Sequence, residues 1–366
     1  MNISMNTGMH ASSLQPGRSN GLSSGSPALS PSTPLPRWAP YALAVAVAAA
    51  TAGLFAVSDL QGRAGFVVVT VPLYLVALTA LSAAREGGRR ARDRVAAATV
   101  GVLSALALLP LGSLVVYGIQ QGAARFDPTF FQFSLRNIGA RDAGGGAYHA
   151  IIGTIEQVAV ATALTVPVGL LAAVYVVEYG RGRLAATIRF FVDVMTGIPS
   201  IVAGLFVLSF WILGLGMGFS GFAAGLALSV LMLPIVVRTA EEMLKLVPDE
   251  LREAAYALGV PRWKTILRIV LPTALPGIVT GIMLAVARVA GETAPVLLTA
   301  FGAQSINANV FEGEQSSLPL FIFQQATLPQ QTAVNRAWTA AIVLVGFVMI
   351  LNLLARLVTS RSRIGR

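Results

Sequence analysis

Two charged residues interrupt an apolar stretch in the segment VARVAGETAPVLLTA, residues 286–300. Arg288 lies inside an apolar run from 273 to 297, and Glu292 follows four residues later. A charge near the centre of a membrane helix costs about 2.5–3.5 kcal/mol on insertion scales, and helical spacing would let the two side chains pair. Two interpretations stay open: a structural ion pair that fixes helix packing, or an arginine on a solute path that binds an oxyanion through its planar guanidinium.

A second charged segment, LREAAYALGVPRWKTILRIVLP at residues 251–272, lies between long apolar runs. Pro248 suits the first turn of a helix, and the two acids that follow it favour the positive helix N-terminus. Gly259 can close this helix in the left-handed conformation, and Pro261 suits the start of a second short helix that Pro272 would end. We therefore expect an elbow of two short helices, which on these grounds alone could be an amphipathic hairpin on anionic lipid.

Eight apolar segments are long enough to cross about 30 Å of hydrocarbon and so to position these charges. They are expected to be helices because lipid offers no hydrogen-bond partner to the backbone. The predicted spans are 38–58, 65–84, 95–118, 148–178, 190–213, 219–238, 273–297 and 337–358.

The composition agrees with a membrane protein and excludes several other classes. Of 366 residues, 55% are hydrophobic and 11% charged, against about 25% charged in an average soluble protein. The net charge of +10 comes from basic residues between apolar runs, so no nucleic-acid partner is expected. With no cysteine and two histidines, no metal site or cofactor is expected in this chain. The sequence also lacks the glycine-rich GK[ST] phosphate loop of an ATPase.

Basic residues concentrate on one predicted side of the membrane. They fill the connections at 85–94, 181–189 and 238–268 and the C-terminal end, whereas the opposite loops hold Arg63, Arg125, Arg136, Arg141 and Arg336. The positive-inside rule therefore predicts that both termini and the elbow are cytoplasmic.

The chain divides into four predicted parts. Residues 1–36, rich in Ser, Pro, Gly and Asn, are expected to form a disordered cytoplasmic tail. Residues 37–94 hold two additional membrane helices and a basic loop, and residues 95–358 hold six helices with the elbow at 248–271. Residues 359–366 form a short basic tail.

Two carboxylates inside the predicted spans have no evident role. Glu156 lies early in the fourth span, where it either reaches the outer interface or lines a path. Asp193 lies near the predicted start of the fifth span, where a negative charge favours a helix N-terminus. Periodicity leaves the fold of the outer segment 299–336 open.

The spacing in the elbow resembles the EAA loop of ABC-importer permeases. Glu253-Ala254-Ala255 is followed after three residues by Gly259, and nine residues later by the segment IVLP at 269–272. In that family this cytoplasmic loop docks into a groove on the ATP-hydrolysing subunit and transmits its closure to the membrane helices. The resemblance implies an all-α, type I ABC-importer permease. The coupling residues it implies are Glu253, Ala254, Ala255, Gly259, Pro261, Leu271 and Pro272.

Further segments are similar to the PstA-type permease subunit of the phosphate-specific ABC importer. They are TGIPSIVAGLF (196–206), LPIVVRTAEEML (233–244), ARVAGETAPVLLTA (287–300) and SLPLFIFQQA (317–326). The likeness runs from about residue 95 to 358, and Ala294-Pro295 favours the A-type over the C-type subunit. It implies that Arg238 and Arg288 take part in phosphate passage, with Glu292 beside Arg288. By its position alone, Arg238 would be an ordinary anchor at a cytoplasmic helix end.

The resemblance also implies partners and a location. They are a homologous C-type permease subunit, a pair of ABC ATPase subunits that use the ATP, an extracytoplasmic phosphate-binding protein and the lipid of a prokaryotic inner membrane. The chain itself would be no enzyme. Alternatives are a permease for another oxyanion such as sulfate or molybdate, or a membrane scaffold or sensor with little transport. A proton-coupled carrier would have no use for the elbow.

Overall fold

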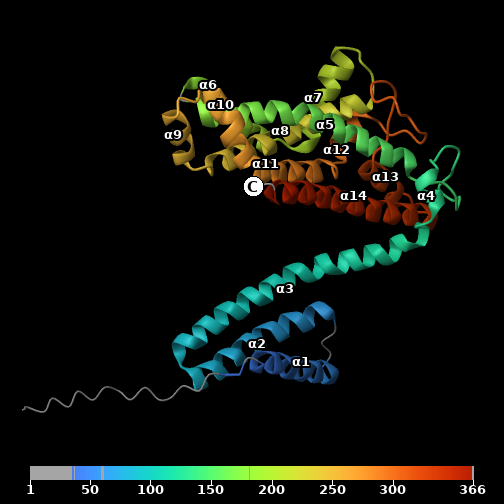
Figure 1. Cartoon of the computed structure of the whole chain (residues 1–366). Helices are drawn as coiled ribbons and strands as arrows, with labels where there is room; N and C mark the ends of the chain where they lie inside the picture. Colours follow the sequence, from blue (N-terminus) through green and yellow to red (C-terminus); the bar gives the residue numbers. More distant parts are fainter. Residues whose placement is uncertain (1–34, 37, 59–61, 181, 365–366) are drawn as a thin grey trace, which may run out of the picture. The chain divides into compact units, whose positions relative to one another are not determined.

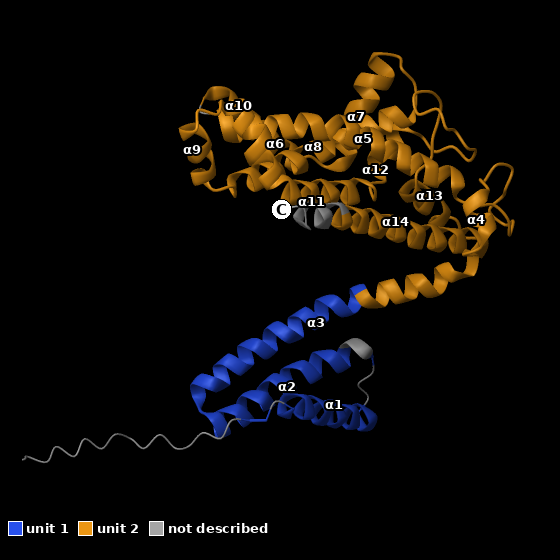
Figure 2. Ribbon diagram, viewed as in Figure 1, with its two compact units in different colours: residues 1–111 blue, residues 112–366 orange. Residues whose placement is uncertain are grey.

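The computed structural model describes residues 35–36, 38–58, 62–180 and 182–364. Within them every element is a helix apart from one isolated bridge between Phe301 and Gln315. Most of the predicted tail, residues 1–34, lies outside the described residues. The chain forms two compact units, residues 1–111 and 112–366 (Figure 2). Their boundary falls inside a single helix rather than at residue 94, where the basic loop ends.

The first unit contains α1 (Ala39–Val57), α2 (Arg63–Glu86) and most of α3 (Gly88–Gly122). The buried Glu86 carboxylate closes the corner between α2 and α3. It accepts hydrogen bonds from the Arg94 guanidinium at 2.7 Å, the Ser82 hydroxyl at 2.9 Å and the Leu35 amide at 2.6 Å. Because the ionised carboxylate is paired and fully hydrogen-bonded, its burial is compensated.

The second unit contains the remaining helices (Figure 1). In chain order they are η1 (Ala123–Arg125), α4 (Pro128–Gln132), α5 (Tyr148–Val174), η2 (Tyr175–Tyr179), α6 (Arg183–Thr196), α7 (Ser200–Val207), η3 (Leu208–Gly214), α8 (Gly221–Lys245), α9 (Asp249–Ala257), α10 (Arg262–Thr265), η4 (Ile266–Val270), α11 (Leu271–Val289), α12 (Ala294–Thr299), α13 (Leu318–Ala326) and α14 (Gln331–Ile364). Within this unit α9 and α10 lie at one end, and α4 and α13 at the other (Figure 1). Residues 359–364, predicted as a tail, continue α14.

Seven helices of the described residues are long and apolar enough to cross a membrane, or eight if one bent pair is a single span. Seven of the predicted spans therefore correspond to long helices. The exception is the prediction for 190–213, which is wrong as a straight helix because α6 and α7 are bent by 107°. Gly197 ends α6, and Pro199 at φ −59°, ψ 139° precedes α7. A proline lacks the amide proton and restricts the preceding residue to extended conformations, so the helix breaks there.

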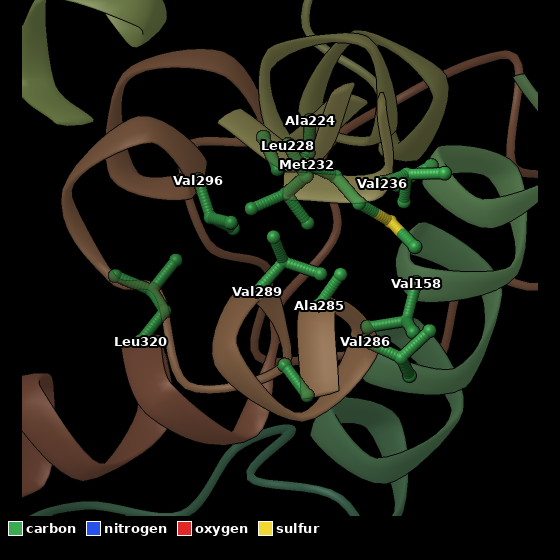
Figure 3. Close-up of a cluster of buried hydrophobic side chains, with 13 residues drawn as sticks. Val158, Ala224, Leu228, Met232, Val236, Ala285, Val286, Val289, Val296 and Leu320 are labelled. Carbon is green, nitrogen blue, oxygen red and sulfur yellow. The ribbon is translucent and has the colours of Figure 1, made fainter. Parts of the chain in front are cut away.

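The main core of the second unit forms where α5, α8 and α11 meet (Figure 3). The cluster contains Val158 and Ala161, Ala224, Leu228, Met232 and Val236, Ala285, Val286, Val289 and Ala290, Val296, Ala300 and Leu320. Glycines let these helices approach closely, as is common in membranes. A Cβ at Gly225 would lie 2.5 Å from Val160 Cγ1, and one at Gly281 would lie 2.6 Å from Thr239 Cβ. Helix α8 therefore lies at the centre of the unit, and over half of the residues in its most apolar stretch are buried.

Candidate functional site

The elbow has the predicted turn. Pro248 precedes α9, whose first turn contains Asp249 and Glu250. Gly259 follows α9 at φ +75°, and the Val260 amide donates to the Ala255 carbonyl at 3.0 Å. This left-handed geometry closes a helix at low cost for glycine and at about 1–2 kcal/mol for most other residues.

The second half of the elbow differs from the prediction that a separate short helix ends at Pro272. Residues Arg262–Val289 form one continuous 28-residue helical stretch, composed of α10, η4 and α11. Pro272 directly follows the π-helical segment η4, where the regular i→i−4 hydrogen bonding is already interrupted. Leu271 packs against a buried cluster of α5, α6 and α8 residues. The second half of the elbow therefore belongs to the same helical stretch as one of the candidate membrane spans.

The motif residues of α9 differ in exposure. Ala255 is buried at 3% exposure, whereas Glu253, Ala254 and Gly259 are exposed. Large apolar side chains around them are also uncovered in this chain, with Leu258 83% and Trp263 59% exposed. The elbow thus exposes large apolar side chains together with small residues, which suits contact with another protein.

A buried ion pair joins the elbow to the end of α5. Arg252 donates from Nη2 and Nε to Glu178 Oε1 at 3.0 and 3.1 Å, and the Glu178 side chain is 3% exposed. Arg252 also donates to the carbonyls of Leu244 at 3.0 Å and Val247 at 2.6 Å. Glu178 was not predicted from the sequence, although a carboxylate at the end of an apolar span beside a basic loop was a usable signal.

Arg262 adds a second connection to the same segment. Its guanidinium donates to the Glu178 carbonyl and lies 4.9 Å from the centre of the Tyr179 ring. Between these residues is a polar cavity of about 470 Å³, which Lys245, Glu253 and Tyr256 also line. Both halves of the elbow are consequently held to η2, at the end of α5.

A further ion cluster joins α6 to α8 near the elbow. Glu241 Oε1 lies 3.0 Å from Arg189 Nε and 2.7 Å from Lys245 Nζ, and Arg189 also donates to the Val176 carbonyl at 3.3 Å. The basic residues that indicated orientation in the sequence therefore also connect α5, α6 and α8.

The predicted pairing of Arg288 with Glu292 is wrong. Arg288 is exposed in the last turn of α11, which ends at Val289, and the Glu292 amide donates to the Val289 carbonyl in the turn that follows. Since the helix ends between them, helical i,i+4 geometry is lost, and the described residues contain no ion pair between the two. Glu292 instead lines a small pocket beside Gln157 of α5 and Ser317.

Arg238 forms an ion pair with Asp193 of α6, and each side chain is about half exposed. The prediction that Asp193 is a helix-start charge is wrong, because Asp193 lies in the last turn of α6 rather than its first. Arg238 and Arg288 lie at different depths. Thr239 of α8 faces Gly281 of α11, so the two arginines are separated by about six residues, or about 9 Å, along the helix axes.

Glu156 is tied to the outer segment that follows α12. Gln315 donates to its carboxylate at 2.6 Å, and Gln157 donates to the Ser316 carbonyl at 3.2 Å. Gln315 and Ser316 are buried, and Leu318 donates to Thr154 at 2.7 Å as α13 begins. Segment 299–336 thus packs on α5 through polar contacts that its periodicity did not reveal.

Comparison with known proteins identifies relatives of the chain. Residues 165–364 match the family model described as binding-protein-dependent transport system inner membrane component. The chain is 50% identical over 279 residues to the phosphate transport system permease protein PstA 1 of Mycobacterium tuberculosis (strain CDC 1551 / Oshkosh), covering 75% of this chain and 92% of the relative. It is 47% identical to PstA of Mycobacterium leprae (strain TN), covering 72% and 88%.

Among solved structures, a chain of the MetNI methionine ABC transporter in an inward-facing conformation is similar, with a TM-score of 0.48 and 21% identity. The match covers 57% of this chain and 93% of that one. The family match spans more than half of the chain, and the mycobacterial relatives are matched over most of their length. The chain is therefore a permease of the ABC-transporter class and belongs to the family of binding-protein-dependent transport system inner membrane components.

Proposed function

We propose that this chain is the PstA-type permease subunit of an ATP-driven importer of inorganic phosphate. The observation that carries the proposal is the 50% identity to a protein named as a phosphate transport system permease. The match covers 92% of the length of that relative. The chain would form half of the translocation path, with a homologous C-type permease subunit forming the other half. A separate pair of ATPase subunits would use ATP, and an extracytoplasmic phosphate-binding protein would deliver the anion.

The elbow is suited to coupling by its contacts. Its exposed apolar face offers a contact surface for an ATPase subunit, while Glu178 holds α9 to the end of α5. A shift of the elbow would reach Arg288 through the continuous helix Arg262–Val289, over a length of about 40 Å. Because these residues form one helical stretch, a shift at its elbow end would change the packing of α11.

The arginines are suited to passage of an oxyanion. Arg288 and Arg238 are both exposed in this chain, at two depths of adjacent helices. A planar guanidinium binds phosphate oxygens bidentately, and the Asp193 carboxylate would keep the Arg238 site from holding the anion permanently. Arg288 has no carboxylate partner among the residues that the structure describes and would provide the stronger attraction along the path.

The test is uptake of radiolabelled phosphate at micromolar concentration in cells that lack the native gene. Cells would carry the native chain, Arg288→Gln or Gly259→Val at matched membrane levels, with sulfate as the control anion. We expect native uptake and a loss of at least tenfold in both variants. Arg141→Gln, an exposed outer arginine, and Gly182→Val, a glycine with open space and ordinary φ, should retain uptake.

Other results would redirect the assignment. Sulfate uptake that depends on the chain, with no dependence of phosphate uptake, would identify a permease for another oxyanion. If neither anion depends on the chain while it still assembles with ATPase subunits, the scaffold or sensor alternative replaces transport.

A further inference from the structure

The first unit contains a groove between its three helices that the proposed transport function does not use. The cavity has a volume of about 440 Å³ and is lined by Tyr41 of α1, Tyr74 of α2 and, on α3, by Arg94 and small residues up to Ala105. Its lining is mainly apolar, with the guanidinium of Arg94 at one end. The groove lies wholly within this unit, so its shape is set by α1, α2 and α3 alone.

The length of the groove matches one membrane leaflet. From Arg94 to Ala105 the lining follows α3 for 11 residues, or about 16 Å. Half of a hydrocarbon core of about 30 Å is about 15 Å. A second membrane helix would need a groove over the full thickness of the hydrocarbon core. One acyl chain needs only about the length that this groove has.

The surface inside the groove suits an acyl chain. Ala97, Gly101 and Ala105 follow Arg94 at spacings of three or four residues, so they share one face of α3. A Cβ at Gly101 would meet no atom within 4 Å, which shows open space at the middle of the groove.

The mouth of the groove suits an anionic headgroup. Arg94 is held by Glu86 at 2.7 Å and by the Leu35 carbonyl at 3.3 Å, so its position is fixed. Residues 85–94 contain five arginines and two carboxylates, hence a net charge of +3. Arg90 is exposed one turn before Arg94 on the same face, and the exposed Tyr41 adds a phenol. Clusters of arginine beside a membrane helix attract anionic headgroups.

We propose that this groove is a binding site for one anionic phospholipid, with an acyl chain along Ala97–Ala105 of α3 and the headgroup at Arg90, Arg94 and Tyr41. The proposal does not depend on phosphate being the transported solute. The N-terminal helices then form a lipid-binding site. The positive charge selects an anionic headgroup, and the length of the groove suits an acyl chain of one leaflet.

The test uses the full chain with its partner subunits in nanodiscs. Phosphatidylglycerol that carries a photoactivatable diazirine in one acyl chain is the probe, and the matching phosphatidylcholine is its neutral control. Cross-linked peptides are mapped by mass spectrometry. We expect phosphatidylglycerol to label residues 97–105 and 74–78 at least fivefold more than phosphatidylcholine does.

Two matched pairs of variants separate a site from general lipid contact. Gly101→Phe fills the groove and should reduce this labelling at least tenfold, whereas Gly112→Phe, on the same helix with equally open space but outside the groove lining, should not. Arg90→Gln should reduce it about fivefold, whereas Arg92→Gln removes the same charge from the opposite face of α3 and should have little effect.

Three outcomes would overturn the proposal. One is unchanged labelling in Gly101→Phe, which would indicate ordinary surrounding lipid. Another is equal labelling by the neutral probe, which would exclude recognition of the headgroup. The third uses a photoactivatable residue in place of Ala97. If that residue cross-links to a helix of a partner subunit, the occupant of the groove is protein.

Discussion

Individual ion pairs in this chain differ in environment, and this decides what each can do. Glu178 and Arg252 are almost fully buried, whereas Asp193 and Arg238 are each about half exposed. A buried charge that loses its partner is strongly destabilising, while an exposed pair contributes about 0–1 kcal/mol. The first pair is therefore suited to holding structure and the second to exchanging partners.

Removing Arg252 should destabilise the protein through Glu178. Arg252→Leu leaves a buried carboxylate unpaired, and we expect the free energy of unfolding to fall by about 3–5 kcal/mol. The double variant Glu178→Gln with Arg252→Leu should lose less free energy of unfolding than Arg252→Leu alone, because it leaves no buried unpaired carboxylate. Thermal unfolding of the purified chain measures both. Arg268→Leu, an exposed arginine of the elbow, serves as control, and a double variant no better than the single one would contradict a charge-pair origin.

Arg238 and Asp193 distinguish a path residue from a packing residue. Arg238→Gln removes the positive charge, and we expect phosphate uptake to fall at least tenfold with the thermal midpoint little changed. Asp193→Asn breaks the same ion pair but keeps the arginine, so uptake should remain at half of native or more. Uptake at matched membrane levels is the measurement. Equal losses in the two variants would assign the pair to helix packing instead.

At the scale of elements, the elbow combines a sharp turn with a continuous helical stretch. Gly259 provides the turn at φ +75°, and Arg262–Val289 form a 28-residue helical stretch. The broken span α6–α7 shows the opposite behaviour, because Pro199 interrupts its helix in the apolar region. Pro276 lies inside the continuous stretch and Pro199 at a break, so the presence of a proline does not by itself decide between these outcomes.

Substitutions at Gly259 should rank by their tolerance of a positive φ. Asparagine adopts the left-handed conformation readily and a β-branched residue does not, so Gly259→Asn should retain most phosphate uptake and Gly259→Val should lose most of it. Uptake and membrane level are measured together. Gly182→Val, at an exposed glycine with φ −135°, should transport normally. Equal activity of the Asn and Val variants would show that the turn geometry is not required.

At the scale of the whole molecule, the family match and the core occupy the same part of the chain. The family model covers residues 165–364, and the main buried cluster contains no residue before Val158. Helices α1 and α2 form a separate unit with α3. The orientation of all these helices is predicted from the basic loops, with the elbow in the cytoplasm.

The absence of cysteine allows a direct test of this orientation. A single cysteine at Arg141 or at Gly182 is placed in an exposed loop on opposite predicted sides. A membrane-impermeant maleimide should label Arg141→Cys in right-side-out spheroplasts and Gly182→Cys in inside-out vesicles. The cysteine-free native chain gives the background. Reversed labelling would place the elbow outside the cytoplasm and contradict coupling to a cytoplasmic ATPase.

The sequence by itself determined the features that depend on local chemistry. Apolar runs of sufficient length predicted the helical class and the positions of most spans, because a backbone in lipid must satisfy its hydrogen bonds internally. The left-handed Gly259 and the acidic first turn of α9 followed from residue preferences within a few positions. The spacing of the elbow motif predicted the family, which the comparisons confirm.

Only the tertiary structure decided which charges meet. Asp193 and Arg238 are 45 residues apart and Glu178 and Arg252 are 74 apart, so helix packing rather than sequence spacing brings each pair together. Arg288 and Glu292 show the converse, since their spacing predicted a pair that the end of α11 prevents. The 107° bend after α6 and the continuity through Pro272 likewise depend on how surrounding helices accommodate a proline, which composition cannot specify.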